Sequence, residues 1–342
     1  MQHGVPPRPM KIYRGIDARL PRHPRALTIG NFDGVHRGHQ AMIALLRNEA
    51  QHRGLPSCAM TFEPHPRDHF AQALGRPEIA PARIATLRDK LSELASCGVD
   101  ECVILPFDER FASQSPQAFI DDVLVRALGV KYVLVGDDFR FGARRGGDYS
   151  MLDAAGAARG FDVARMNSYE VHRLRVSSSA VREALARGDM DTTAALLGRP
   201  YSISGHVVHG RRLGRELGET AHGRGDGFRT LNLRFSHWKP AASGIFVVQV
   251  HGLDAQPLPG VANLGVRPSL DPDDVNGGRV LLETHCLRWP AHLGTEGGYG
   301  KIIRVELLHK LHDELRYDGL AALSAGIARD CDAARAWFAA RI

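Results

Sequence analysis

The sequence lacks the cysteine pairs that zinc sites, redox sites and disulfide frameworks need. No two of its five cysteines have the Cys-x-x-Cys spacing, and five is an odd number scattered along the chain. They are Cys58, Cys97, Cys102, Cys286 and Cys331. We therefore expect buried, reduced thiols in a cytoplasmic protein.

Long apolar runs and dense basic runs are also missing. The N-terminal residues contain no signal-peptide core, and no segment approaches the roughly 20 apolar residues that span a membrane. Aromatic residues make up 7% of the chain, and its net charge of +6 suits small anionic molecules better than nucleic acid. We expect small-molecule substrates, no nucleic-acid or membrane partner, and a monomer or weak homo-oligomer.

The length of 342 residues exceeds what one hydrophobic core usually serves, so two domains are expected. Short apolar runs at 26–29, 58–62, 102–105 and 132–135 alternate with helical patterns. One predicted helix carries Ile84, Leu87, Leu91 and Leu94 and ends at Gly98; another spans 116–128, with Ser115 as N-cap and Gly129 as stop. This alternation predicts a parallel sheet with helices on both faces, preceded by a loosely held segment over residues 1–25.

The periodicity changes near residues 189–200, which include a short predicted helix at 192–197. Beyond it, apolar residues alternate with period two around 245–250 and 303–307, between turns rich in Gly and Pro. Such runs predict an antiparallel barrel or sandwich. The segment 319–342 is expected to be a helix packed on it. We place the domains at 1–187 and 188–342.

The segment 27–46 combines an apolar strand, a glycine-rich loop and the start of a helix. His36 and His39 lie where the loop gives way to the helix, with Gly38 between them. Helix N-termini favour phosphate, and imidazoles can donate hydrogen bonds to phosphate oxygens. With Asn31 and Asp33 nearby, we predict a nucleotide-phosphate site; a plain tight turn is the alternative.

The pattern GNFDGVHRGH resembles the His-x-Gly-His nucleotidyltransferase signature of bacterial bifunctional riboflavin kinase/FMN adenylyltransferases. The resemblance implies a Rossmann-like α/β domain followed by a riboflavin kinase-like antiparallel β-barrel with a C-terminal helix. It also implies catalytic roles for His36 and His39. The nucleotide-binding residues that it implies at this loop are Gly30, Asn31, Phe32, Asp33 and Gly38.

Two later loops match family segments of the adenylyl-transfer site. Residues 61–66, TFEPHP, read as a stiff extended loop and resemble the Phe-x-Pro-His-Pro segment. Residues 136–142, GDDFRFG, resemble the Gly-x-Asp-Phe-Arg-Phe-Gly motif, in which one aromatic residue is expected to anchor the loop in the core. The flavin-binding residues thereby implied are Phe62, Pro64, Pro66, Asp138, Phe139 and Arg140.

Three serines precede another predicted helix, and an arginine follows one turn later. Hydroxyls, free N–H groups and a guanidinium on one face suit a pyrophosphate leaving group, although one serine could simply cap the helix. The run resembles the family's Ile-Ser-Ser-Thr-x-x-Arg motif. It implies phosphate-binding roles for Ser177, Ser178 and Ser179 and a catalytic role for Arg182.

The second half carries its own candidate kinase residues. Thr230 and Asn232 offer hydroxyl and amide oxygens that suit Mg²⁺, and Glu283 in a strand-like run can take a proton from a substrate hydroxyl. An outward-facing strand residue is the alternative for Glu283. Four arginines in the loop 209–227 can wrap phosphates or form a solvated surface: Arg211, Arg212, Arg215 and Arg224.

Segments 210–218, 260–268, 282–285 and Tyr299-Gly300 resemble the riboflavin kinase module. The resemblance implies that Glu283 is the general base and that Thr230 and Asn232 are magnesium ligands. The family's Gly-Phe-Pro-Thr-Ala-Asn is Gly-Phe-Arg-Thr-Leu-Asn here, with Arg229 for the proline and Leu231 for the alanine.

The leading hypothesis is a two-step ATP-dependent enzyme that makes FMN from riboflavin and then FAD from FMN, with Mg²⁺, ATP and flavins as metal, co-substrate and substrates. A single-activity adenylyltransferase with a degenerate kinase domain is the runner-up. A flavin-binding or nucleic-acid-binding module without chemistry is a third possibility.

Overall fold

The computed structural model describes residues 9–17, 19–171, 174–209, 230–234, 239–266, 280–294 and 297–341. The chain forms two compact units. The first comprises Met1–Pro81 and Lys90–Ser177, and the second Ala82–Asp89 and Ser178–Ile342. A boundary between functional domains after residue 187 stays a prediction.

The first unit is built on a six-stranded sheet in the order β1-β4-β3-β2-β5-β6, with every neighbouring pair parallel. The strands are β1 (Lys11–Arg14), β2 (Arg25–Ile29), β3 (Ser57–Glu63), β4 (Glu101–Pro106), β5 (Val130–Gly136) and β6 (Asp162–Met166). This confirms the predicted parallel sheet, whose four apolar runs became β2 to β5.

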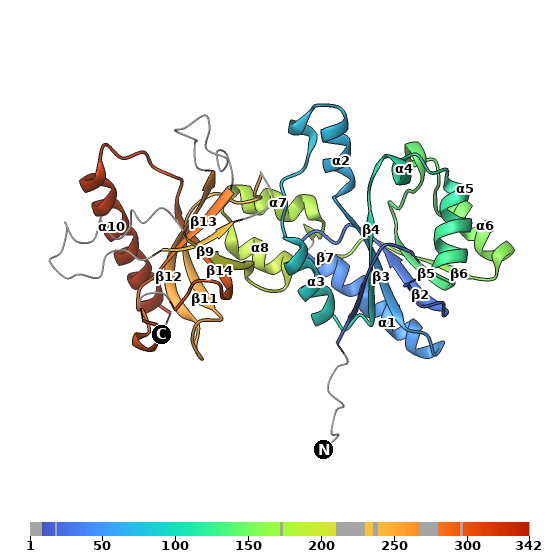
Figure 1. Cartoon of the computed structure of the whole chain (residues 1–342), viewed down its shortest axis with the longest axis horizontal. Helices are drawn as coiled ribbons and strands as arrows, with labels where there is room; N and C mark the ends of the chain where they lie inside the picture. Colours follow the sequence, from blue (N-terminus) through green and yellow to red (C-terminus); the bar gives the residue numbers. More distant parts are fainter. Residues whose placement is uncertain are drawn as a thin grey trace, which may run out of the picture. The chain divides into compact units, whose positions relative to one another are not determined.

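Helices lie on both sides of this sheet (Figure 1). They are α1 (Arg37–His52), α2 (Pro66–Ala73), η1 (Pro77–Ile79), α3 (Leu87–Ser96), α4 (Glu109–Ala112), α5 (Pro116–Ala118) running into η2 (Phe119–Ala127), η3 (Ala143–Arg145) and α6 (Tyr149–Arg159). A small hairpin, β7 (Glu170–Val171) and β8 (Leu174–Arg175), precedes the second unit. Ser115 caps α5 as predicted, its hydroxyl accepting from the Ala118 N–H at 3.1 Å.

Neighbouring residues of β2 enter different cores. Ala26 packs with Leu46 of α1, whereas Leu27 belongs to the cluster that contains Leu124 of η2 and Leu152 of α6. Successive strand residues point to opposite faces, so a strand buried on both faces is mostly apolar and its polar residues need partners. β2 is accordingly apolar at Ala26, Leu27 and Ile29, whereas its buried Arg25 is paired with Glu101 at 2.7 Å.

Two expectations for the first ninety residues are wrong. Residues 11–14 are not part of a loose lead-in but form β1, the edge strand beside β4. Ile84 lies before α3 rather than within it: it sits in a bend, next to Arg83, which donates its N–H to the Lys239 carbonyl at 3.1 Å. Ile84 is buried all the same, so its apolar character reflects packing and not helical periodicity.

The second unit is a closed antiparallel barrel in the order β10-β13-β12-β11-β14-β9, as expected. Its strands are β9 (Tyr201–Val208), β10 (Leu231–Arg234), β11 (Gly244–His251), β12 (Leu258–Val266), β13 (Val280–Cys286) and β14 (Ile302–His312). The helices are α7 (Ser178–Arg187), α8 (Met190–Leu197), η4 (Ala291–Leu293) and α10 (Leu320–Ala339).

The C-terminal helix α10 packs on the outside of the barrel, as predicted (Figure 1). Cys331 and Ala334 of α10 form a buried cluster with Val247 of β11 and Val261 of β12. Among the residues described, no helix has the length and apolar character to cross a bilayer.

Four of the five cysteines are buried, and Cys97 is half-buried, which corrects the expectation for that residue. Burial raises the pKa of Cys102 to about 12, with a small opposing effect of Lys90. A thiol with so high a pKa stays protonated and unreactive.

Candidate active sites

The loop between β2 and α1 has an unusual backbone. Phe32 and Val35 adopt positive φ angles of 48° and 40°, and Gly34 adopts 81°. Phe32 and Val35 are fully buried. Non-glycine residues in the left-handed region are strained and persist only where packing holds them, commonly at functional sites. Buried Phe32 and Val35 thus fix the loop that leads into α1.

His36 is the N-cap of α1. Its Nδ1 accepts a hydrogen bond from the His39 N–H at 3.4 Å, so the neutral ring carries its proton on Nε2. The His36 and His39 rings stack with centroids 3.7 Å apart, and the Phe32 ring meets His39 edge-on at 5.1 Å. The predicted pair therefore stands together at the first turn of the helix.

Two glycines of the motif make room for the site's own rings. A Cβ at Gly38 would lie 3.2 Å from the His36 ring, and one at Gly30 would lie 3.1 Å from the Phe32 ring. Gly38 also passes close to the Val176 carbonyl, which is 3.5 Å from the same Cβ position. The chain leading into the serine run, up to Ser177, thus passes the first turn of α1.

His39 is held neutral. Burial lowers its pKa well below the ordinary value, and the nearby His36 and Lys90 lower it further. Its Nδ1 is buried and has no hydrogen-bond partner within the described part of the chain. A buried polar nitrogen left unpaired is costly, so a phosphate oxygen that accepts from it would remove that cost.

Lys90 is a residue of this site that sequence reasoning missed. Its side chain is almost fully buried in α3, and its Nζ lies 3.4 Å from the Thr61 hydroxyl. That hydroxyl donates to the Asn31 carbonyl at 3.3 Å. One signal was available: Lys90 falls on the face of α3 that Leu87, Leu91 and Leu94 mark as apolar, where a lysine is rare.

The residues predicted at the end of the serine motif lie in α7 of the second unit. Ser178 is the first residue of α7, and Ser177 belongs to the first unit. The Arg182 Nε donates to the Ala82 carbonyl at 2.7 Å, so this guanidinium helps to hold the segment 82–89 within the second unit. The phosphate-binding roles of Ser177, Ser178 and Ser179 and the catalytic role of Arg182 stay predictions.

The predicted extended loop at 61–66 is shorter than expected. Thr61, Phe62 and Glu63 lie in β3, and Pro66 starts α2, so only Pro64 and His65 connect them. Proline is well suited to the first helical position, and His65 caps the helix by accepting from the Arg67 N–H at 3.1 Å. Phe62 packs edge-on against Phe107, with centroids 5.7 Å apart.

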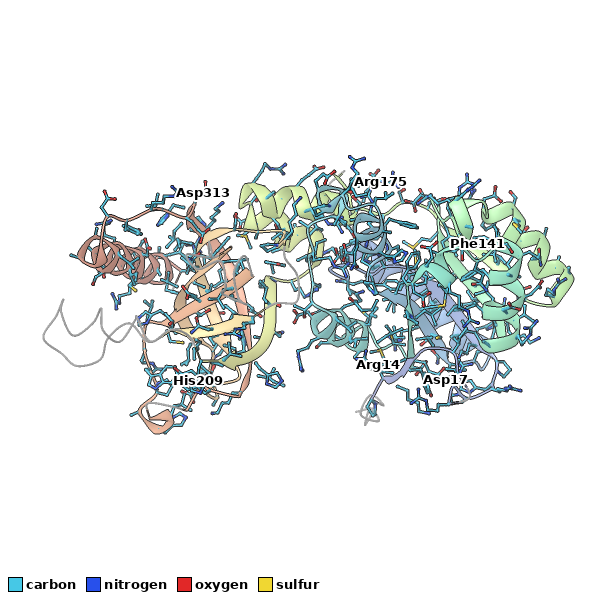
Figure 2. The ribbon with its side chains drawn as sticks, turned by 45° about the horizontal axis from the view of Figure 1, so that its top comes forward. Arg14, Asp17, Phe141, Arg175, His209 and Asp313 are labelled. Carbon is cyan, nitrogen blue, oxygen red and sulfur yellow. The ribbon has the colours of Figure 1, made fainter. Side chains whose placement is uncertain are left out.

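After β5, one aromatic residue anchors the loop, as predicted. Phe141 (labelled in Figure 2) is buried; its ring centroid lies 5.4 Å from that of Phe119 and 5.5 Å from that of Phe139, on which it stacks. Phe139 is half-buried and Asp138 is exposed. Arg140 forms an ion pair with Asp148 at 3.2 Å. The flavin contacts predicted here remain expectations.

The second unit brings two of its predicted residues together. Asn232 on β10 and Glu283 on β13 are direct register partners, and they share one face of the barrel wall. Asn232 is buried, and its Nδ2 donates to the Thr230 carbonyl at 3.4 Å. Its Oδ1 is buried without a hydrogen-bond partner among the described residues. Thr230 lies just before β10, not within the strand.

Several candidates of the second half lie outside the described residues. They are Arg211, Arg212, Arg215, Arg224 and Arg229, with residues 267–268 of the matched segment 260–268. Leu231, the other departure from the family pattern, is buried on β10. Just after β9, the ring of His209 (labelled in Figure 2) stacks on Tyr299 with centroids 3.9 Å apart.

Comparisons with known proteins find a match for each half of the chain. The family model for FAD synthetase matches residues 20–180, and that for riboflavin kinase matches residues 197–338. The bifunctional riboflavin kinase/FMN adenylyltransferase of Escherichia coli K12 is 44% identical over 96% of this chain and 98% of its own length. Those of Pseudomonas fluorescens and Haemophilus influenzae are 42% and 38% identical, each over 96% of this chain.

A crystal structure titled macrolide-efflux protein, from Streptococcus pneumoniae, superposes with a TM-score of 0.72 at 23% identity. It covers 95% of this chain and 99% of that one, and at this identity it supports the fold alone. The full-length sequence matches carry the assignment: this chain belongs to the family of bifunctional riboflavin kinase/FMN adenylyltransferases.

Proposed function

We propose that this chain makes FAD from riboflavin in two ATP-dependent steps, with one site in each unit. The observation that carries the proposal is that each half of the chain matches one of the two family models and holds a candidate site, while the bifunctional relatives match over nearly the full length. Nothing favours the alternative of a single-activity adenylyltransferase, because the riboflavin kinase match spans the whole barrel and α10.

In the adenylyl transfer, an FMN phosphate oxygen attacks the α-phosphorus of ATP, and the α–β bond breaks to release pyrophosphate. Negative charge builds up on the phosphate oxygens, where N–H donors are most effective. His39, with its unpartnered Nδ1, and the His36 Nε2–H supply such donors at the start of α1. No covalent enzyme intermediate is required.

In the kinase step, the 5′-hydroxyl of riboflavin attacks the γ-phosphorus of ATP and gives its proton to Glu283. The unpartnered Oδ1 of Asn232 and the hydroxyl of Thr230 fit Mg²⁺, which binds hard oxygen ligands and keeps several waters. Mg²⁺ bound there would neutralise charge on the ATP phosphates. The substrates are thus small molecules: ATP, riboflavin and FMN.

The test is direct. Purified chain is incubated with riboflavin, ATP and Mg²⁺, and the flavins are separated over time. We expect FMN first and FAD with pyrophosphate afterwards. FAD from added FMN without FMN from riboflavin would select the single-activity alternative, and tight flavin binding without any product would select a binding module.

A further inference from the structure

Three polar side chains lie in one row across three neighbouring barrel strands. Glu283 on β13 is the register partner of Asn232 on β10 and of Asn263 on β12. Directly opposed residues of an antiparallel pair point to the same face of the sheet. The two asparagines therefore flank the Glu283 carboxylate, one on each side.

Each asparagine has an amide oxygen that is buried and has no hydrogen-bond partner within the described ranges. A buried acceptor without a donor is costly, and native structures leave few of them. Here two of them lie on either side of one carboxylate. This arrangement indicates that a ligand supplies a donor or a cation to each amide oxygen.

The strand spacing favours separate contacts for the two oxygens over one shared metal ion. Adjacent strands are roughly 4.8 Å apart, so β10 and β12 are separated by about 9.6 Å with β13 between them. Oxygens bound to one Mg²⁺ lie at most about 4.2 Å apart, since each Mg–O distance is about 2.1 Å. If Asn232 binds the metal, Asn263 faces a different part of the ligands, on the other side of Glu283.

Two carboxylates lie on the strand face that carries Asn263: Glu283, its register partner, and Glu314. Gly265 lies two residues further along β12 and shares its face. A side chain at Gly265 would collide with the Glu314 carboxylate, so this carboxylate lies over the same face. Amide and carboxylate oxygens suit a ligand rich in O–H donors. The polyol chain of riboflavin is such a group, and its terminal hydroxyl is the one that reacts.

We propose that Asn263 is a substrate-binding residue of the kinase site, whose Oδ1 accepts a hydrogen bond from a hydroxyl of the riboflavin polyol chain. This inference rests on the proposed roles of Glu283 and Asn232. It divides the row into a metal side at Asn232 and a polyol side at Asn263. No bond to Asn263 forms or breaks during the reaction.

The experiment compares two flavins that differ in the polyol. Binding of riboflavin and of lumiflavin, which has a methyl group in place of the polyol, is measured by flavin fluorescence in the presence of ADP and Mg²⁺. Asn263→Leu removes the acceptor at nearly constant size, and Asn263→Ala removes it without adding apolar bulk. We expect either variant to bind riboflavin about 10-fold more weakly and lumiflavin as the wild type does.

Asn263→Asp keeps an oxygen in place and is the matched control, with riboflavin affinity expected within about threefold of wild type. FAD formation from FMN, expected to be unchanged in all variants, reports on the first unit, and wild-type lumiflavin affinity reports on the folding of the barrel. Equal loss of both flavins would overturn the proposal, as would unchanged riboflavin binding with an altered Mg²⁺ dependence. If the wild type fails to phosphorylate riboflavin, the proposed kinase function fails. If the wild type phosphorylates riboflavin and the Asn263 variants bind riboflavin as tightly as it does, only the Asn263 inference fails.

Discussion

At the residue scale, the spacing of His36 and His39 was readable from the sequence, but their environment was not. The glycine-rich loop and the helical pattern after it predicted that the two histidines lie at the start of a helix. Stacking of the rings and the unpartnered Nδ1 of His39 depend on the buried turn at Phe32. Lys90 reaches the site by contacting Thr61, which is 29 residues away in sequence. No local pattern reports such a contact.

The first prediction concerns His39. We expect His39→Ala to lower kcat for FAD formation from FMN about 10²- to 10³-fold, because one preorganised donor to the phosphates is lost. FMN formation from riboflavin should continue at the wild-type rate. His52→Ala, an exposed histidine in the last turn of the same helix, is the control and should leave both rates unchanged. Equal activity of His39→Ala and His52→Ala would remove His39 from the site.

The second prediction concerns Lys90. Its positive charge disfavours the protonated form of His39, so Lys90→Met should raise the pKa of His39. NMR titration of the His39 ring measures this shift directly. We also expect FAD formation to fall about tenfold or more, since a buried cation beside the phosphate donors is lost. Lys131→Met, at an exposed position on β5, should change neither quantity. A His39 pKa that stays constant or falls in Lys90→Met would contradict the proximity of the two groups.

At the scale of elements, burial decides what sequence patterns can show. β2 to β5 are buried apolar runs and were predicted to within a residue or two. β1 and β6 were missed because most of their side chains are exposed or half-buried, leaving no apolar signal. Ile84 gave the opposite error: it is buried and apolar but lies in a bend before α3, so the pattern placed it in the helix. The barrel was predicted because apolar residues alternate with period two beyond residue 200, and α10 was predicted as the helix that follows.

The third prediction concerns the attachment of α10 to β14. The His312 Nε2 lies 2.9 Å from the Asp330 carboxylate of α10, and Nδ1 lies 2.7 Å from the Asp313 carbonyl. Only the doubly protonated ring donates to both. Burial opposes the charge, but the hydrogen bonds with Asp330 and Asp313 outweigh it and raise the pKa of His312. The stabilisation is therefore fully present below the unfolded-state pKa of about 6.5 and is lost as pH rises through the folded-state pKa.

Thermal unfolding of His312→Gln across pH checks this. Wild type should exceed the variant in Tm by roughly 2–4 °C near pH 6, and the gap should shrink as pH rises. Asp330→Asn should show the same pH profile, because it removes the other partner. A gap that widens with pH would mean that the neutral ring makes the stabilising contact.

At the scale of the whole molecule, two units and two activities could be predicted from length, change of period and motifs. The assignment of segment 82–89 and of α7 to the second unit could not, because it depends on contacts such as Arg182 with Ala82. The role of Asn263 was also missed. Its motif was recognised, but its place beside Glu283 follows only from the register of the barrel.

The fourth prediction separates the two activities. Glu283→Ala should lower FMN formation by at least about 100-fold, since no base then takes the proton of the attacking hydroxyl. FAD formation from added FMN should stay unchanged. His285→Ala, two residues further along the same strand face, is the matched control and should retain FMN formation to within a few fold.

The most direct test of two separate sites is a mixing experiment. His39→Ala and Glu283→Ala proteins are incubated with riboflavin, ATP and Mg²⁺, first singly and then together, and the flavins are separated. Alone, the first should accumulate FMN and the second should leave riboflavin unchanged. Together they should make FAD, because FMN released by one protein is adenylylated by the other. A folded variant that loses both steps, or a mixture that accumulates FMN without FAD, would contradict the account.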